Sequence, residues 1–189
     1  MARRLMSLTA PLATLPEVEA AIWRELAAAL RTRGHAWRQA VLATTDGTAG
    51  DARTVIVREV DAAARTLTVY TDARSAKAAQ VEAFPQGTLV LWSAPLGWQL
   101  RLRVQLALQV QGDAVMSRWE RLKSSAAAAD YRSTVAPGSQ VAAPRVAIGE
   151  QSHFALLTAR VQAVDWLELH ADGHRRACFD ATGQHWLAP

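Results

Sequence analysis

An arginine stands at each end of a short strand-like segment, and this pair of cations is the feature of the sequence best suited to chemistry. The segment reads Arg53-Thr54-Val55-Ile56-Val57-Arg58. It is followed by Tyr70-Thr71 and, after a turn, by Ser75-Ala76-Lys77 at the start of an expected helix. A helix start offers free backbone N–H groups and the positive end of a dipole, and both favour a phosphate.

Three side chains near this helix start have the chemistry of a phosphate site. The Ser75 hydroxyl can donate a hydrogen bond, Lys77 supplies a positive charge, and Arg53 can grip two oxygens at once. A surface arginine on a strand and an ordinary helix cap account for the same residues when each is taken alone. The residues therefore indicate an anion site only in combination.

Other common catalytic and metal-binding signatures are absent from the sequence. It contains no Walker loop, no Rossmann glycine fingerprint, no His-Glu-x-x-His and no Gly-x-Ser-x-Gly. Its C-terminal histidines lack the close pairing that zinc prefers, and Cys178 is the single cysteine. We therefore expect no metal site, and the sequence identifies no catalytic residue.

Composition predicts one folded domain over residues 1–189, with residues 1–15 as an N-terminal tail. Half of the 189 residues are hydrophobic, the net charge is +4, and no apolar run reaches the roughly 18 residues of a membrane span. The start of the chain lacks the apolar region of a secretion signal, which favours a cytoplasmic protein. A basic chain suits nucleic acid, an anionic membrane or a phosphorylated ligand. Because the expected strands lack interleaved aromatic residues for stacking bases, we do not expect nucleic acid as a partner. Because no apolar run is long enough to span a membrane, we do not expect a membrane as a partner either.

Hydrophobic periodicity predicts a mainly β fold, a β-barrel with peripheral helices. The clearest strand is 101–111, in which five apolar residues from Leu102 to Val110 alternate with polar or small ones. The other expected strands are 39–45, 53–60, 67–71, 88–93, 154–170 and a last one at 174–179; helices are expected at 16–32, 75–84 and 113–129, with a loop at 135–144. Because βαβ alternation is missing, an antiparallel barrel fits better than a doubly wound parallel sheet.

Five segments, in order, resemble the pyridoxamine 5'-phosphate oxidase family. The first two are the arginine-flanked strand and the Tyr70-Thr71 to Ser75-x-Lys77 region. The third, Trp92 with Pro95-Leu96-Gly97-Trp98-Gln99-Leu100-Arg101, is similar to that family's entry into a barrel strand. The last two are Tyr131 with Gly138-Ser139-Gln140, and Val164–Leu169 with His174-Arg175-Arg176. Together they cover about residues 16–189.

The resemblance implies an antiparallel FMN-binding split barrel that forms a homodimer, with FMN in a cleft between the subunits. Arg53, Ser75 and Lys77 would hold the FMN phosphate, and Gln99 would bond the edge of the ring system. Arg58 replaces the family's usual lysine and would face the reactive side of the flavin. The implied cofactor-binding set is Arg53, Thr54, Val55, Ile56, Val57, Arg58, Tyr70, Thr71, Ser75, Lys77, Gln99 and Arg176; the implied substrate contacts are Arg58, Tyr131 and Ser139.

Departures from the family pattern concern the substrate more than the cofactor. Val135 stands where the family has a substrate-phosphate arginine, Ala76 replaces an arginine, and Leu167 falls at the position of an aromatic residue. An uncompensated phosphate dianion is costly to bury, so these changes argue against vitamin B6 oxidation and for a divergent branch.

Three functions remain open at this point. The first is an FMN-dependent oxidoreductase acting on a small molecule, and the second is a flavin carrier or sensor without efficient turnover. The third is a basic barrel that binds nucleic acid or another anion. A related cofactor, a deazaflavin or haem, is compatible with the same cleft.

Overall fold

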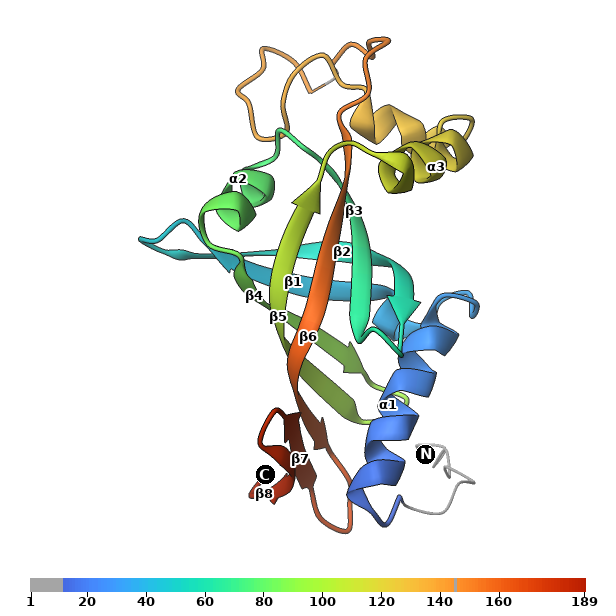
Figure 1. Cartoon of the computed structure of the whole chain (residues 1–189), viewed down its shortest axis with the longest axis vertical. Helices are drawn as coiled ribbons and strands as arrows, with labels where there is room; N and C mark the ends of the chain where they lie inside the picture. The colour runs from blue at the N-terminus through green and yellow to red at the C-terminus, as the bar shows by residue number, and fades with distance from the viewer. Residues whose placement is uncertain (1–11, 145) are drawn as a thin grey trace, which may run out of the picture.

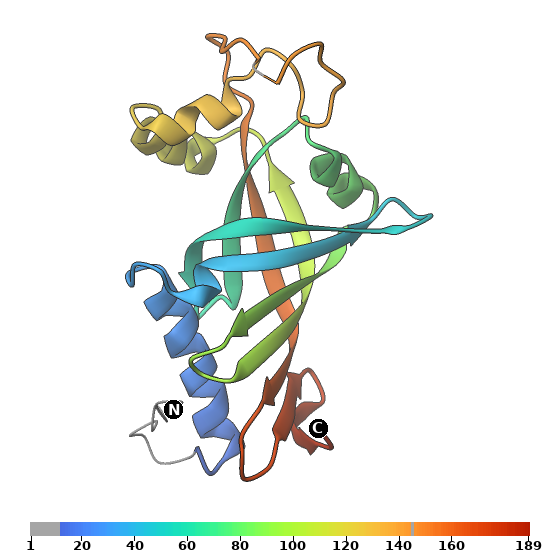
Figure 2. The ribbon, with the colours of Figure 1, turned by 180° about the vertical axis from the view of Figure 1, so that it is seen from behind.

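The computed structural model describes residues 12–144 and 146–189 and shows an antiparallel barrel with helices at its periphery (Figure 1; Figure 2). Its strands follow the order β3-β2-β1-β4-β5-β6-β7-β8, and β3 also pairs with β6. The first six strands therefore close into a barrel, which confirms the predicted fold class. The strands are β1 (Gln39–Thr45), β2 (Gly50–Asp61), β3 (Thr66–Asp72), β4 (Gln86–Ser93), β5 (Trp98–Gln109), β6 (Phe154–Glu168), β7 (Arg175–Asp180) and β8 (Gly183–Leu187).

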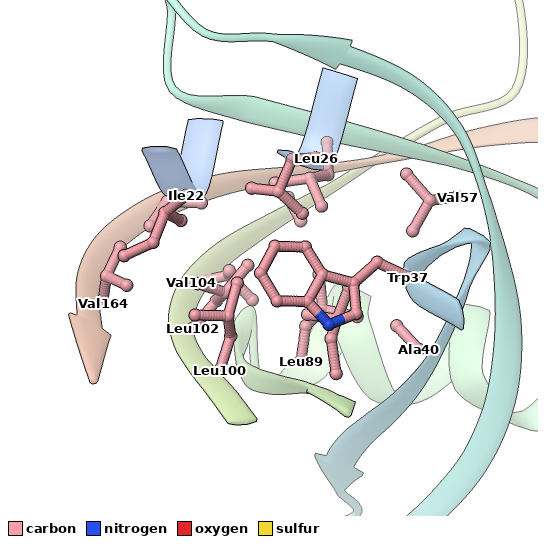
Figure 3. Close-up of a cluster of buried hydrophobic side chains, with 14 of the residues drawn as sticks. Ile22, Leu26, Trp37, Ala40, Val57, Leu89, Leu100, Leu102, Val104 and Val164 are labelled. Atoms are coloured by element: carbon pink, nitrogen blue, oxygen red, sulfur yellow. The ribbon is translucent and has the colours of Figure 1, made fainter. Parts of the chain in front are cut away.

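The barrel interior is filled by alternate residues of the strands and sealed by helix α1 (Leu15–Ala29). On β5, Leu100, Leu102 and Val104 are buried, whereas the arginines between them are exposed, as the period of two predicts. Trp37 lies at the centre of this core, surrounded by side chains from α1, β4 and β5 (Figure 3).

Helix α1 begins where its sequence signals place it. The Thr14 hydroxyl accepts a hydrogen bond from the Glu17 backbone, and the Glu17 carboxylate accepts one from the Thr14 backbone at 3.0 Å. This reciprocal pair is a capping box. The helix then buries the apolar stripe Val18, Ile22 and Leu26 against the barrel. The predicted tail, residues 1–15, lies mostly outside the described residues, and its last residue, Leu15, is already helical.

Two of the expected elements extend past the ends that the structure gives them. The helix expected over 113–129 stops at Leu122 (α3, Asp113–Leu122), and Ala126–Tyr131 forms the 3-10 helix η2. Ser124 and Ser125 separate the two, and serine favours turns over helix interiors because its hydroxyl competes for backbone groups. Strand β5 ends at Gln109, so Val110 is exposed rather than in the core.

The strand expected at 174–179 is not the last one, because β8 follows it after a turn at Asp180. The Asp180 carboxylate accepts from the backbone and the hydroxyl of Thr182, which closes this turn. Most of β8 is exposed, so it carries no alternating pattern from which it could be predicted.

A second, smaller hydrophobic cluster lies outside the barrel, where α3 and η2 cover the ends of β3 and β6 (Figure 1). It contains Val115, Tyr131, Phe154 and Leu156, with Tyr70 and Trp119 packed against it. The short helices α2 (Ala76–Ala83) and η1 (Ala36–Arg38) complete the fold. Among the described residues, no helix combines the length and the apolar character needed to cross a membrane.

Candidate functional site

Arg53 lies between the barrel and α2, held by a network of polar contacts. It is on the same side of β2 as the buried Val55, beyond the apolar core. Its guanidinium donates to the Thr44 hydroxyl at 2.5 Å and to the Gln80 side-chain oxygen at 3.0 Å, and it forms an ion pair with Asp51. Because Gln80 lies one helical turn after Lys77, this network fixes Arg53 against the same helix that carries the lysine.

The start of α2 gathers the residues expected to hold a phosphate. Ser75 is the buried N-cap residue, yet its hydroxyl makes no capping hydrogen bond. Instead it lies 3.2 Å from the Lys77 ammonium, which donates to it, and 3.3 Å from the Thr71 hydroxyl. The free backbone N–H groups of the first turn are close by.

Lys77 is held in an environment that disfavours its own charge. Burial, and next the positive charge of Arg53, lower the pKa of Lys77; the carboxylates of Asp72 and Asp51 oppose this more weakly. In the described part of the chain, the lysine has no carboxylate within ion-pair distance. Arg53 is paired with Asp51, whereas Lys77 forms no ion pair among the described residues, so the helix start keeps an excess of positive charge. Such a place suits an anionic ligand, and these residues therefore fit the phosphate group of FMN.

Arg58 projects from an irregularity in the sheet. Between β2 and β3, Val57 pairs with Val69 but Glu59 pairs with Thr68, so Arg58 is an extra residue in a β-bulge. Its guanidinium lies 5.7 Å from the centre of the Tyr70 ring, and its buried Nε has no hydrogen-bond partner among the described residues. Burial raises the pKa of Tyr131, and the nearby charge of Arg58 opposes that rise. The structure therefore brings two predicted substrate contacts together.

Glu59, the residue after the bulge, ties α3 to the barrel. Arg118 on α3 donates to both carboxylate oxygens, at 2.8 and 2.7 Å, and the Tyr70 hydroxyl donates to one of them at 3.0 Å. The hydrogen bonds from Arg118 lower the pKa of Glu59 more than burial raises it. No local sequence pattern indicates this contact, because Glu59 and Arg118 are far apart in the chain.

Gln99 and Arg176 form a separate group on the outer surface of the barrel. Gln99 pairs with Leu167 on β6, and Leu167 pairs with Arg176 on β7. Arg176 makes two hydrogen bonds to Asp165, at 3.0 and 2.8 Å, and Arg101 pairs with the same carboxylate. Burial alone would raise the pKa of Asp165, but hydrogen bonds from the two arginines outweigh it and lower the pKa.

One chain does not bring the two groups of expected cofactor residues together. Arg53 is on β2 and Gln99 on β5, and these strands are three steps apart in either direction around the six-strand ring. At roughly 4.8 Å per step, opposite strands are separated by the width of the barrel. Arg53 also lies on the inward side of β2, the side of the buried Val55, whereas Gln99 lies on the outward side of β5.

The segment after η2 carries the third expected substrate contact. Ser139 is in an exposed part of this loop, and within the described residues no hydrogen bond joins its side chain to Tyr131. Arg132 is the arginine nearest to Val135, but its Nε donates to the Gly149 carbonyl at 2.8 Å and thus closes the base of the loop. No cluster of three or more metal-ligating side chains is found within residues 12–144 and 146–189.

Comparisons with known proteins agree with this geometry. Residues 20–110 match the sequence model of the pyridoxamine 5'-phosphate oxidase, FMN-binding domain, family. Among curated proteins, none matches the chain. The matched region, slightly less than half of the chain, includes both the arginine-flanked strand and the start of α2, so the expected resemblance to this family and to its FMN-binding domain is confirmed.

Two solved structures are similar over almost their full length. One is a pyridoxamine 5'-phosphate oxidase-related, FMN-binding protein from Nostoc punctiforme, with 25% identity and a TM-score of 0.73, covering 96% of this chain and 99% of that one. The other is PhzG from Burkholderia lata in complex with tetrahydrophenazine-1-carboxylic acid, with 15% identity, a TM-score of 0.74, and coverage of 97% and 99%. At that identity, the second likeness supports the fold alone.

Replacing Glu59 by Gln should lower the free energy of unfolding near neutral pH, by about 0.5–1 kcal/mol, because the ion pair with Arg118 is lost. The folded-state pKa of Glu59 lies below its ordinary value of 4.5, so its stabilisation is present above that value and disappears as the pH falls. Urea denaturation of wild type and Glu59→Gln should therefore differ at about pH 7 and converge as the pH falls well below 4.5. Glu150→Gln, at an exposed position, is the control; a Glu59→Gln effect that persists in acid would contradict the ion pair as its source.

Proposed function

We propose that the chain is an FMN-dependent oxidoreductase that acts on a small molecule, since residues 20–110 match the FMN-binding domain of pyridoxamine 5'-phosphate oxidase. The observation that carries the proposal is the cationic start of α2, where the Lys77 ammonium lies 3.2 Å from the buried Ser75 hydroxyl and Gln80 holds Arg53 against the same helix. A phosphate dianion bound there would balance this positive charge and accept hydrogen bonds from Ser75 and the first turn of the helix.

The bound FMN would supply hydride and electron-transfer chemistry, and the protein would supply position and charge. Arg53, Lys77 and Ser75 would hold the phosphate. Arg58 lies in the β-bulge, and its buried Nε has no hydrogen-bond partner among the described residues. We assign to it a hydrogen bond to an acceptor on the substrate or on the flavin ring. Tyr131, buried against Phe154, would wall this side of the site and keep water from it.

The substrate side favours an activity other than vitamin B6 oxidation. Val135 supplies no charge, and the guanidinium of Arg132 is already bonded to the Gly149 carbonyl. Among the described residues of this loop, a second phosphate would therefore meet little compensating charge. We propose that the substrate is a small molecule without a phosphate. We also propose that the protein acts in the cytoplasm and does not bind nucleic acid.

Substitutions in the phosphate cradle, the group of Arg53, Ser75 and Lys77, should weaken FMN binding without unfolding the protein. Lys77→Ala or Arg53→Ala should each raise the FMN dissociation constant about 10- to 100-fold, because each removes charged hydrogen bonds to the phosphate. Quenching of flavin fluorescence measures the affinity, and circular dichroism checks the fold. Lys123→Ala is the matched control, since Lys123 pairs with Glu120 away from α2. Unchanged affinity in both cradle variants would show that the phosphate is held elsewhere.

Turnover separates an oxidoreductase from a flavin carrier. The FMN-loaded protein should oxidise NADH or NADPH, or consume oxygen with a reduced small-molecule substrate, faster than free FMN at the same concentration. Stopped-flow absorbance of the flavin and an oxygen electrode measure the two reactions. An FMN-loaded protein that matches free FMN in every assay would favour the carrier or sensor.

A homodimer would join the two groups of cofactor residues that one chain leaves apart. The outer face of β1 and β4 carries Val41, which is 40% exposed, and Trp92, which is 46% exposed. Val41 pairs with Thr54 on one side and with Val90 on the other, so this apolar face adjoins the outward residues of the arginine-flanked strand. Exposed apolar patches of this kind mark interfaces. We propose that a second copy covers this face and brings its Gln99 and Arg176 to the flavin held by the first.

A charge placed on this face should separate the subunits. Trp92→Glu should convert a dimer into a monomer in size-exclusion chromatography with light scattering, because an unpaired carboxylate is costly to bury in an interface. It should also weaken FMN binding, since each site would lose its contribution from the partner. Met116→Glu, at a more exposed position on α3, is the control. A Trp92→Glu protein that remains a dimer with full FMN affinity would contradict this interface.

A further inference from the structure

A buried carboxylate lies beside the proposed phosphate cradle, in the turn that joins β3 to α2. The side chain of Asp72 is only 4% exposed. It accepts hydrogen bonds from Arg74 alone among the described residues: from Nε at 3.1 Å, from a terminal nitrogen at 2.7 Å, and from the backbone N–H at 2.8 Å. The side-chain hydrogen bond with Asp72 raises the pKa of Arg74, so the guanidinium keeps its charge at neutral pH.

The negative charge of Asp72 reaches the cradle. The Asp72 carbonyl accepts a hydrogen bond from the Ser75 backbone N–H at 3.1 Å, so Asp72 adjoins the N-cap, and its negative charge opposes the lowering of the Lys77 pKa. Asp72 is also the residue between Thr71 and the turn that leads to Ser75. If Arg74 were absent, an unpaired carboxylate would lie next to the proposed site of the FMN phosphate, where it would repel that anion.

Arg74 has a second contact, with the loop that follows η2. The same terminal nitrogen that binds Asp72 donates to the Ser133 carbonyl at 2.9 Å. One residue earlier, the Ala73 backbone donates to the His153 carbonyl at 2.8 Å. The turn between β3 and α2 therefore holds both ends of the segment 133–153, which contains Ser139.

The base of this loop is a small two-stranded arrangement that depends on the position of Ser133. Ser133 forms an isolated bridge with Ile148, the Thr134 backbone donates to Ala147 at 2.9 Å, and the Gly149 backbone donates to Arg132 at 2.7 Å. The Arg74 contact lies at Ser133, the residue that forms the bridge.

We propose that Arg74 is a positioning residue for both halves of the active site: it neutralises Asp72 beside the FMN phosphate, and it fixes the base of the substrate loop at Ser133. This inference rests on the proposed FMN site. The two roles use different bonds of one guanidinium, so they respond differently to substitution. Without the Asp72 carboxylate there is no negative charge for Arg74 to neutralise. The loop still requires the hydrogen bond from Arg74 to the Ser133 carbonyl.

A double-mutant cycle tests the charge role. FMN affinity is measured by flavin fluorescence for wild type, Arg74→Met, Asp72→Asn and the double variant. Arg74→Met should weaken binding about tenfold or more, because a like charge is left beside the phosphate. Asp72→Asn should remain within about threefold of wild type, and the double variant should recover to the level of Asp72→Asn. A double variant as weak as Arg74→Met would overturn the role assigned to Asp72.

Amide hydrogen exchange tests the loop role in the same proteins. The amides of Thr134 and Gly149 should exchange faster in Arg74→Met and also in the double variant, even though the latter has recovered its FMN affinity. Asp72→Asn should exchange like wild type. Equal exchange rates in all four proteins would overturn the loop role.

A conservative variant keeps the test decisive if Arg74→Met does not fold. Arg74→Lys retains the positive charge but not the planar fork, so it should bind FMN nearly like wild type while Thr134 and Gly149 exchange faster. An Arg74→Lys protein with weakened FMN binding and an unchanged loop would contradict the proposal. Absence of FMN binding by wild type would overturn the proposed function as well, whereas wild-type binding with an unaltered Arg74→Met affinity overturns this inference alone.

Discussion

The placing of two cations, Arg53 and Lys77, at the start of α2 is the constraint on which the rest of the site depends. Like charges are unfavourable in a partly buried place, and the fold keeps them there with groups that are themselves fixed. Arg53 is held by Thr44 from β1, by Gln80 from α2 and by an ion pair with Asp51, and Lys77 is held next to the N-cap Ser75. Such preorganisation is useful to a protein that binds an anion, because the cost of assembling the charges is met on folding and not on binding.

The closed barrel explains both where this cradle lies and what it lacks. Six antiparallel strands fix β2 at one side of the ring and β5 at the other, so one set of expected flavin contacts cannot reach the other set within a chain. The bulge at Arg58 turns one cation out of the regular alternation, toward Tyr70 and Tyr131. The outer face with Val41 and Trp92 then offers the surface through which a second copy would complete the site.

The parts of this structure that were predictable from the sequence are those set by local pattern. The alternation of apolar and polar residues in β5 and the apolar stripe of α1 depend on residues a few positions apart. The helix that begins after Ser75 was predicted from local residues in the same way. The polar contacts that organise the site join distant residues: Arg118 with Glu59, and Arg74 with Ser133. Their partners are chosen by tertiary packing, which no local period records. Strand β8 was missed for a related reason, since its exposed residues obey no pattern and its pairing with β7 alone makes it a strand.

The two ends of the site are under different physical constraints. At the cofactor end, a dianion must be matched by charge in a confined place, so Arg53, Lys77 and the helix start have few substitutes. At the substrate end, the contacts of the loop after η2 within the described residues lie at its base, with Arg74, Arg132 and the Ser133 bridge, while residues 135–144 are largely exposed. Residues such as Val135 and Ser139 can therefore change without disturbing the barrel or the cradle. A fold organised in this way can keep one cofactor while its substrate changes.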